Sequence, residues 1–427
     1  MPPRQCNTIK TEAAKPTKRI CLPLNSEEHE KMVKDAQHFR EKLDEYIACY
    51  PELFPSDIGQ GYQLHGKTEI SVKLPEVRMR RIRLNELDEQ GRVQVYTIAP
   101  SFVLPYMAGY TDEVEEALFA WGFNVPFWGL TYLFGRNDMY WQRLIASLGR
   151  NDIVGTTIKD PALLPEHLLA DEKHTRLNGE RVYLATTGAE GCVLGVSLSL
   201  TADQPGLTEA YGYFQQEAQR VDPDYQPQTV NTDGWLPTQQ AWQKLFSGIV
   251  VVLCFLHAFL SIRSRGKHLK DTFHTITQHV WNIYHTTKPS DFLDQVTILR
   301  SWARSHVSGP TLDAILKLCD KAPLFILAFD YPGSYRTSNM LDRLMDPLDR
   351  WLYAARYFHG HLMSAEYQIR AWALLHNFRP FSPRADIRLL YHSPFHHLNG
   401  FVYHDNWLHN LLVATSLGGR YSPHRIR

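Results

Sequence analysis

The sequence predicts an α/β protein: a mixed sheet that follows a mainly helical region and is interrupted by a further helical segment. Two observations predict this. Between residues 163 and 262, short apolar stretches typical of strands alternate with amphipathic stretches typical of helices. In residues 26–49 and 112–148, by contrast, apolar residues recur mostly at helical spacing.

The composition is that of a globular chain. It has 427 residues, of which 44 % are hydrophobic and 21 % charged, which is enough for two or three domains. Lys+Arg and Asp+Glu are both 45, so the net charge of zero gives no argument for nucleic-acid binding from overall basicity. Any such argument must rest on local patches.

The cysteine content and the apolar runs indicate where in the cell the protein resides. Six cysteines, none in a CxxC pair, indicate a reducing cytosol and no disulfide framework. The N-terminus lacks the apolar core of a secretory signal, and the most apolar run, residues 248–262, is shorter than the roughly 20 residues of a membrane span. We therefore expect a cytoplasmic protein without a membrane segment.

The N-terminal third holds three kinds of segment. Residues 1–24 are polar and basic and predict a flexible tail, with an arm that contacts phosphates as the alternative. Residues 26–49 predict a helix. Residues 66–104 contain β-like stretches, one of which is rich in arginine and is either a basic strand that contacts nucleic acid or an edge strand kept soluble by charge. The arginines are Arg78, Arg80, Arg81 and Arg83.

Residues 112–148 predict three short helices, broken at Gly122 and Gly135. Short helices joined by tight turns are typical of a helix-turn-helix, and of any small helical bundle as well. On the first interpretation, Arg136 and Arg143 are candidate DNA contacts.

From residue 163 the order of elements is three antiparallel strands, helix, strand, helix, strand, helix. Asn178-Gly179 is a strong hairpin signal between the first two strands. The expected strands are residues 168–172, 181–187, 192–200, 228–233 and 249–254, and the expected helices are 208–220 and 238–245. This order is the ribonuclease-H-like arrangement, in which the first and fourth strands are neighbours.

Asp171 and Asp233 fall at the expected ends of those two neighbouring strands. Carboxylate oxygens suit Mg²⁺, and two such ions about 4 Å apart serve both the attacking and the leaving oxygen in phosphoryl transfer. The structural alternative is that Asp233 belongs to an ordinary Asp-Gly turn and that Asp171 caps the hairpin.

Cys254 and His257 follow the fifth strand at a spacing that could form half of a zinc site. The nearest further histidines, His268 and His274, lack the spacing of a second half. The alternative is a buried thiol and a histidine that pack behind the metal site.

The ordered set of motifs resembles the DD(E/D) transposases of prokaryotic insertion sequences, most closely the Mutator-like clade with a Cys-x2-His motif. The resemblance covers roughly residues 160–375 and rests on Leu169-Ala-Asp-Glu with Asn178-Gly-Glu, Asn231-Thr-Asp-Gly-Trp and Leu253-Cys-Phe-Leu-His. It implies a helical insertion after the fifth strand, a third acid on a late helix, and two Mg²⁺ ions, with Mn²⁺ as a substitute. Cys254 and His257 would then support the site.

The third acid departs from the family pattern, which places Glu after a Thr-x-Asn run. The matching stretch here is Arg336-Thr-Ser-Asn-Met-Leu-Asp-Arg, which selects Asp342. Glu366, on another expected helix, is the alternative.

The expected insertion combines basic and aromatic residues, a mixture that suits single-strand backbones and unstacked bases. An ordinary helical bundle with buried tryptophans is the alternative. The candidate DNA contacts are Arg263, Arg265, Lys267, Trp281 and Trp302.

The sequence thus predicts a nucleoid-associated transposase that cuts and joins DNA at the ends of an insertion sequence with Asp171, Asp233 and Asp342. Its partners would be the element's ends and target DNA, bound by a homodimer or higher assembly. The alternatives are a ribonuclease-H-like nuclease and a non-enzymatic DNA-binding protein derived from a transposase. The expected regions are a tail (1–24), a DNA-binding region (25–160), the first part of the core (161–262), the insertion (263–335), the last catalytic helices (336–376) and a C-terminal extension (377–427).

Overall fold

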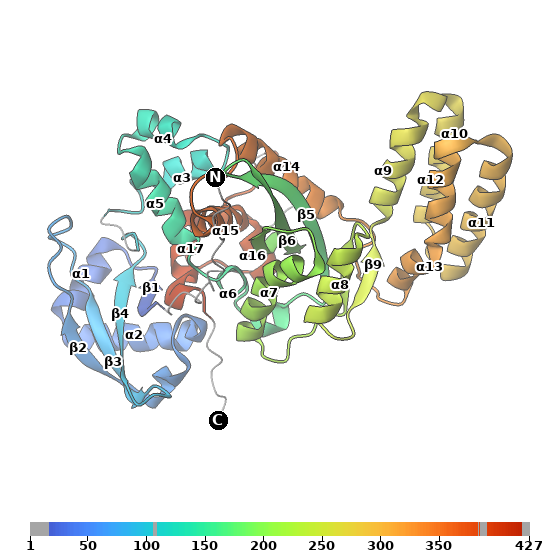
Figure 1. Ribbon diagram of the computed structural model, residues 1–427. Coiled ribbons are helices and arrows are strands. Elements are labelled where there is room, and N and C mark those ends of the chain that lie inside the picture. Colours follow the sequence, from blue (N-terminus) through green and yellow to red (C-terminus); the bar gives the residue numbers. More distant parts are fainter. Residues whose placement is uncertain (1–16, 106–108, 383, 385–390, 421–427) are drawn as a thin grey trace, which may run out of the picture.

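The computed structural model describes residues 17–105, 109–382, 384 and 391–420. The fold is mixed α/β, as predicted, with one four-stranded and one five-stranded sheet. Figure 1 shows the smaller sheet at one end, the larger sheet in the middle, and helices α9–α13 projecting as a separate lobe at the other end.

The N-terminal unit is built on the sheet of order β1-β4-β3-β2. β1 runs parallel to β4, and the other pairs are antiparallel. Two helices, α1 and α2, belong to this unit, and Asp35 separates them because its carboxylate caps the start of α2 by accepting from Gln37 N and His38 N. The bounds are β1 Arg19–Leu22, α1 Ser26–Lys34, α2 Ala36–Cys49, β2 Tyr62–Lys67, β3 Arg80–Leu87 and β4 Val93–Pro100.

Two expectations for this unit are wrong. Residues 19–22 are a strand and not part of a tail, because Ile20, Cys21 and Leu22 are buried against β4 and the C-terminal region. The arginine-rich strand β3 lies inside its sheet, so it is not an edge strand. The tail residues Arg4, Lys10 and Lys15 lie outside the described residues.

The three short helices expected between residues 112 and 148 are present: α3 Glu115–Trp121, α4 Phe127–Phe134 and α5 Asp138–Leu148. Breaks at Gly122 and Gly135 separate them, as predicted. A fourth short helix, α6 Ile153–Thr157, leads into the central sheet. The whole group packs on the late helices of the chain, for example through an edge-on contact between Trp121 and Trp351.

The central sheet has the strand order β7-β6-β5-β8-β9. β6 is antiparallel to both β5 and β7, whereas β5, β8 and β9 are parallel. The first and fourth strands are therefore neighbours, as predicted. The bounds are β5 His167–Leu177, β6 Glu180–Ala189, β7 Cys192–Ser199, α7 Gln204–Val221, β8 Thr229–Thr232, α8 Leu236–Leu245 and β9 Val250–Leu253.

One detail of the prediction is wrong: Asp171 does not end its strand. β5 continues to Leu177 because its pairing with β6 runs without interruption up to the Asn178-Gly179 turn. Only the parallel pairing with β8 stops earlier, at Leu169. Asp171 therefore lies just beyond the point where β5 and β8 separate.

Helices cover both faces of this sheet. α7 and α8 pack with Leu168 and Ala170 on one face, and α14 (Asn339–Ala354) and α15 (Leu362–Phe378) pack with Leu169 on the other. Because side chains alternate along a strand, Asp171 is on the α14 face and Glu172 on the α7 face.

After β9 the chain forms a lobe of helices with its own hydrophobic core, which includes Ile262, Ile283, Leu299 and Ile315. The segment expected as a helical insertion is thus built from helices. They are α9 Phe255–Gly266, α10 Asp271–Tyr284, α11 Pro289–His306, α12 Gly309–Asp320 and α13 Ala322–Phe325.

The C-terminal region joins the two sheets. α17 (Trp407–Ala414) follows α16 (Pro394–Asn399) and contributes to the same hydrophobic core as β1 and α15. Ser416 Oγ, next to α17, accepts from Cys21 N on β1. Among the described residues, no helix is both long and apolar enough to cross a membrane.

Candidate active site

Three carboxylates predicted from the sequence lie on the same side of the central sheet. Asp171 is on β5, Asp233 directly follows β8, and Asp342 is in the first turn of α14. An ion pair between Lys173 on β5 and Asp349 on α14 holds this helix along the strand. The three carboxylates interact electrostatically, because the charges of Asp233 and Asp342 both act to raise the pKa of Asp171.

A tight turn presents Asp233 at the end of β8. Asp233 Oδ1 accepts from Trp235 N at 2.8 Å, and Gly234 between them has a φ of +92°. A glycine suits this position because other residues rarely adopt a positive φ. The turn role proposed as the structural alternative is therefore real, and Asp233 fills it while its side chain stays exposed beside the site.

A second cluster lies behind the carboxylates and joins the start of α9 to the start of α14. Ser338 N donates to Cys254 Sγ at 3.2 Å, and Ser338 Oγ lies 3.4 Å from His257 Nδ1. The same hydroxyl donates to Asp342 Oδ2 at 3.0 Å. Ser338 thereby orients the third carboxylate, a role to which the sequence pointed only through the Thr-Ser-Asn run.

The charge balance of the site follows from these contacts. Burial raises the pKa of Asp171 to about 6, with the neighbouring carboxylates adding to this effect and His257 opposing it. Hydrogen bonding to Cys254 raises the pKa of His257 to about 9, and Asp171 and Asp342 act in the same direction. Burial opposes ionisation of the Cys254 thiol, but hydrogen bonds from His257 and Ser338 outweigh it and lower the pKa of Cys254. His257 is thus a cation beside three acids at neutral pH.

Glu366, the alternative third acid, lies elsewhere. It is on α15, where its Oε1 accepts from Ser197 Oγ at 2.9 Å and from Leu198 N at 2.6 Å. Both partners belong to β7, two strands away from β5. The structure therefore brings Asp342, and not Glu366, to Asp171.

The acid after Asp171 was missed by the sequence prediction. Glu172 points to the opposite face, where it accepts hydrogen bonds at 2.6 Å from Tyr211 on α7 and from Thr238 on α8. Burial raises the pKa of Glu172 to about 7. Strand alternation is the sequence signal that distinguishes Asp171 from Glu172. Adjacent residues of a strand point to opposite faces of the sheet, so these two acids cannot serve the same site.

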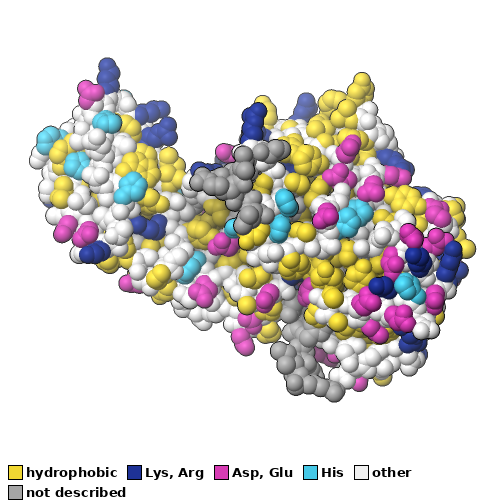
Figure 2. All heavy atoms as spheres, turned by 180° about the vertical axis from the view of Figure 1, so that it is seen from behind, with side chains coloured by type: hydrophobic (Ala, Val, Ile, Leu, Met, Phe, Trp, Pro, Cys, Tyr) yellow, Lys and Arg dark blue, Asp and Glu magenta, His cyan; other side chains and the backbone are white. Residues whose placement is uncertain are grey.

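All five basic residues predicted to contact DNA are exposed: Arg136, Arg143, Arg263, Arg265 and Lys267. Arg136 also pairs with Glu113 at 3.0 Å. Lys and Arg side chains are scattered over the face in Figure 2, and several lie on the lobe formed by α9–α13.

The two tryptophans of the lobe are half-buried in its packing. Trp281 contacts Phe259, and Trp302 stacks on His306 of its own helix at a centroid distance of 5.0 Å. These contacts favour the bundle interpretation of the tryptophans over base stacking.

The predicted helix-turn-helix region presents an unusual surface. The exposed side chains of α4 include Trp128, Tyr132 and Leu133, and α4 carries no charged residue. Phosphate contacts in this region would therefore have to come from α5 and from the turn before it, where Arg143 and Arg136 lie.

The donor chemistry of the site fits Mg²⁺. Among the described residues, no group of three or more His, Cys, Asp or Glu side chains is arranged to hold a metal ion by itself. Mg²⁺ does not need such a group, because it keeps several waters and binds through one or two carboxylates together with substrate phosphates. Two buried polar atoms near Asp171 also lack a partner in the described structure: Thr186 Oγ1 on β6, whose residue pairs with Asp171, and Asn231 Oδ1 on β8, whose residue pairs with Leu169.

The Cys254 and His257 pair is accounted for by its contacts with Ser338, and no second pair of zinc ligands accompanies it within the described residues. This arrangement is that of the thiol and histidine expected behind the carboxylates. Comparison of the sequence with protein-family models and with curated proteins gave no match.

Proposed function

We propose that this protein is a metal-dependent transposase that cleaves DNA at the ends of an insertion sequence and joins the released 3′-hydroxyl to target DNA. The observation that carries the proposal is the convergence of Asp171, Asp233 and Asp342, from three distant parts of the chain, on one face of a mixed sheet. Ionised acids gathered without Lys or Arg ion pairs repel one another and cost folding stability, so they are typical of functional sites.

The fold supports the ribonuclease-H-like interpretation. The order β7-β6-β5-β8-β9, with only β6 antiparallel to the rest, is the arrangement expected from the sequence. The helical lobe stands between β9 and α14, where the resemblance places an insertion.

Asp171, Asp233 and Asp342 are the residues that would hold Mg²⁺. When bound, such ions supply Lewis-acid stabilisation of the attacking and leaving oxygens in an in-line displacement. Ser338 holds the Asp342 carboxylate in place through its hydroxyl. His257, kept cationic by its partners, offsets part of the negative charge of the acids and lies where it can donate to a phosphate oxygen.

The test uses the full chain and labelled DNA that carries the inverted repeats flanking its gene. With Mg²⁺ or Mn²⁺ we expect a nick that leaves a 3′-hydroxyl at the element's end, followed by joined products with target DNA; EDTA should abolish both. Asp342→Asn should abolish them too, while Asp346→Asn, which changes an exposed acid of the same helix, should not.

Two outcomes would contradict the proposal. Cleavage without joining would identify a nuclease on the same fold. Specific binding of the ends without any cleavage in Mg²⁺ or Mn²⁺ would identify a non-enzymatic DNA-binding protein.

A further inference from the structure

A cavity of about 190 Å³ opens beside Asp233, between the end of the central sheet and the helical lobe. Asp233 lines it at the end of β8, Cys254 and His257 line it at the start of α9, and two further residues of the lobe, Lys317 and Lys321, line it from α12 and its C-terminal end. The helical lobe therefore provides one wall of the candidate active site.

Both lysines come from one face of α12 and its C-terminal end, since they are four residues apart. Lys321 reaches the turn that carries Asp233: a Cβ atom on Gly234 would lie 3.5 Å from Lys321 Nζ. Among the described residues, neither lysine forms an ion pair with an acid. Their charges thus face the cavity without a carboxylate partner.

Interaction with the helix dipole is one structural explanation for the positions of Lys317 and Lys321. A lysine near the C-terminus of a helix is stabilised by the partial negative charge there, wherever on the circumference it lies. That effect does not explain why two lysines line the same cavity as Asp233 and His257. The two lysines outnumber the one acid of the lining, Asp233, so the cavity favours an anion within it.

We propose that Lys317 and Lys321 bind backbone phosphates of the DNA strand that enters the active site, next to the phosphodiester to be cut. This inference rests on the proposed function and deepens it. A lysine ammonium is a compact point charge that binds phosphate without requiring a fixed geometry, which suits a strand of any sequence. The lobe then serves to clamp the scissile strand against the three acids.

The experiment compares the double variant Lys317→Ala/Lys321→Ala with Lys317→Arg/Lys321→Arg and with a control. The control, Lys244→Ala/Arg304→Ala, removes the same charge from exposed positions outside the cavity. Binding of the labelled ends is measured by fluorescence anisotropy in Ca²⁺ over a range of salt concentrations. Cleavage is measured in single turnovers with Mg²⁺, and thermal melts verify that all variants fold.

The alanine variant should lose at least tenfold in cleavage rate, and the slope of log affinity against log salt should fall by about 1 to 2, because each lost phosphate contact removes roughly 0.9 from it. The arginine variant should cleave within a few-fold of wild type. Replacing a phosphate next to the scissile one by a neutral methylphosphonate should weaken binding by the wild type but add little to the alanine variant.

The inference and the proposed function fail in different ways. If the wild type cleaves its ends and the alanine variant matches the control in both salt slope and rate, the inference is wrong and the proposed function stands. If the wild type does not cleave, the proposed function is wrong and the inference falls with it.

Discussion

Two groups of acids in this protein are built on opposite principles. In the first, Glu217 and Asp152 are each matched by an arginine: Glu217 pairs with Arg370, and Asp152 pairs with Arg220. In the second, Asp171, Asp233 and Asp342 have no Lys or Arg ion pair among the described residues, and His257 is the cation that offsets them. The first group ties helices together, and the second leaves negative charge available.

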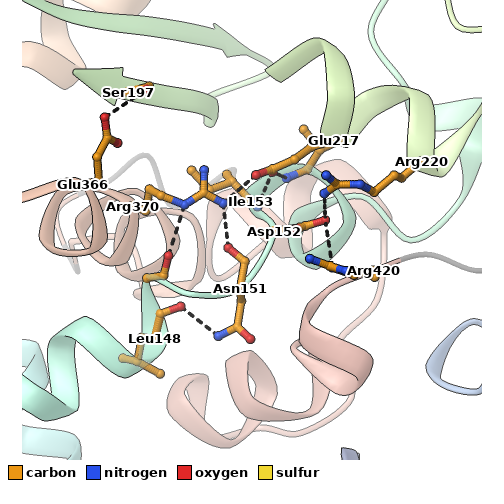
Figure 3. A network of polar contacts seen from close by, with 12 residues as sticks. Leu148, Asn151, Asp152, Ile153, Ser197, Glu217, Arg220, Glu366, Arg370 and Arg420 are labelled. Atoms are coloured by element: carbon orange, nitrogen blue, oxygen red, sulfur yellow. Dashed lines mark hydrogen bonds and ion pairs between the residues drawn. The ribbon is translucent and has the colours of Figure 1, made fainter. Parts of the chain in front are cut away.

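Figure 3 shows the hydrogen bonds and ion pairs that surround the first group. Arg370 on α15 also donates to the carbonyl oxygens of Gly149 at 3.1 Å and Asn151 at 2.8 Å, and Glu217 also accepts from the backbone of α6 at Val154. These bonds join α5, α6, α7 and α15 at one point. The comparison teaches that buried acids with matched arginines serve the fold, whereas acids without such partners are the candidates for a functional site.

The largest expected effect is the loss of DNA cleavage when an acid of the second group is replaced. Asp171→Asn and Asp342→Ala should each lower DNA cleavage by about 100-fold or more, the scale on which removal of one electrostatic group of an active site acts. Asp342→Glu should keep part of the activity, because the longer side chain carries the same carboxylate that the family pattern uses. Cleavage assays on the element's ends measure all three.

Asp171→Asn should not lose stability. Burial and the neighbouring acids raise the pKa of Asp171 to about 6, so its ionised form opposes folding at pH 8. The melting temperature of Asp171→Asn in EDTA at pH 8 should equal or exceed that of the wild type. A clear drop would mean that Asp171 is a structural residue.

The second prediction concerns removal of the arginine that pairs with Glu217 in the first group. Arg370→Met leaves Glu217 buried without its cation, which should cost about 3–5 kcal/mol of unfolding free energy. Denaturant titration measures the loss. The matched control is Arg350→Met, an exposed arginine on α14, which should change stability little. Equal stability of the two variants would show that the network in Figure 3 does not hold the helices together.

The third prediction tests the helix crossing on which the matched group depends. A Cβ atom on Gly149 would lie 1.8 Å from the carbonyl oxygen of Tyr367, so Gly149→Ala should push α5 and α15 apart. We expect a loss of about 1–3 kcal/mol, the usual cost of overpacking. Gly59→Ala meets no atom within 4 Å and serves as the control in the same melts.

The smallest effect concerns Glu366. Burial raises its pKa from the usual 4.5 to about 7, so the folded state binds a proton that the unfolded state releases, and stability falls as the pH rises from about 4.5 to 7. Gln keeps the acceptor for Ser197 and Leu198 but does not ionise. Glu366→Gln should therefore melt a few degrees above wild type at pH 8, gain less at pH 5, and cleave DNA normally. An inactive Glu366→Gln beside an active Asp342→Ala would reverse the assignment of the third acid.

The sequence by itself determined the parts that depend on local patterns. The Asn178-Gly179 hairpin, the alternation of strands and helices around it, and the three short helices before it follow from turn residues and periodicity, which act over a few residues. The neighbouring acids Asp171 and Asp233 follow from the same pattern, because the order of strands predicts which of them lie side by side.

Tertiary structure decided what distant segments do to one another. Residues 19–22 are a strand because β4 and the C-terminal region cover them, and neither is near in sequence. Asp342 joins Asp171 while Glu366 faces β7, although both acids are on helices, because α14 is held to β5 and α15 lies on β7. Lys317 and Lys321 reach the site only because the helical lobe packs beside β9. The physical reason is that a contact between distant segments depends on which helix and strand faces pack together. The periodicity of one segment shows which of its faces is apolar, but not which other segment that face packs against.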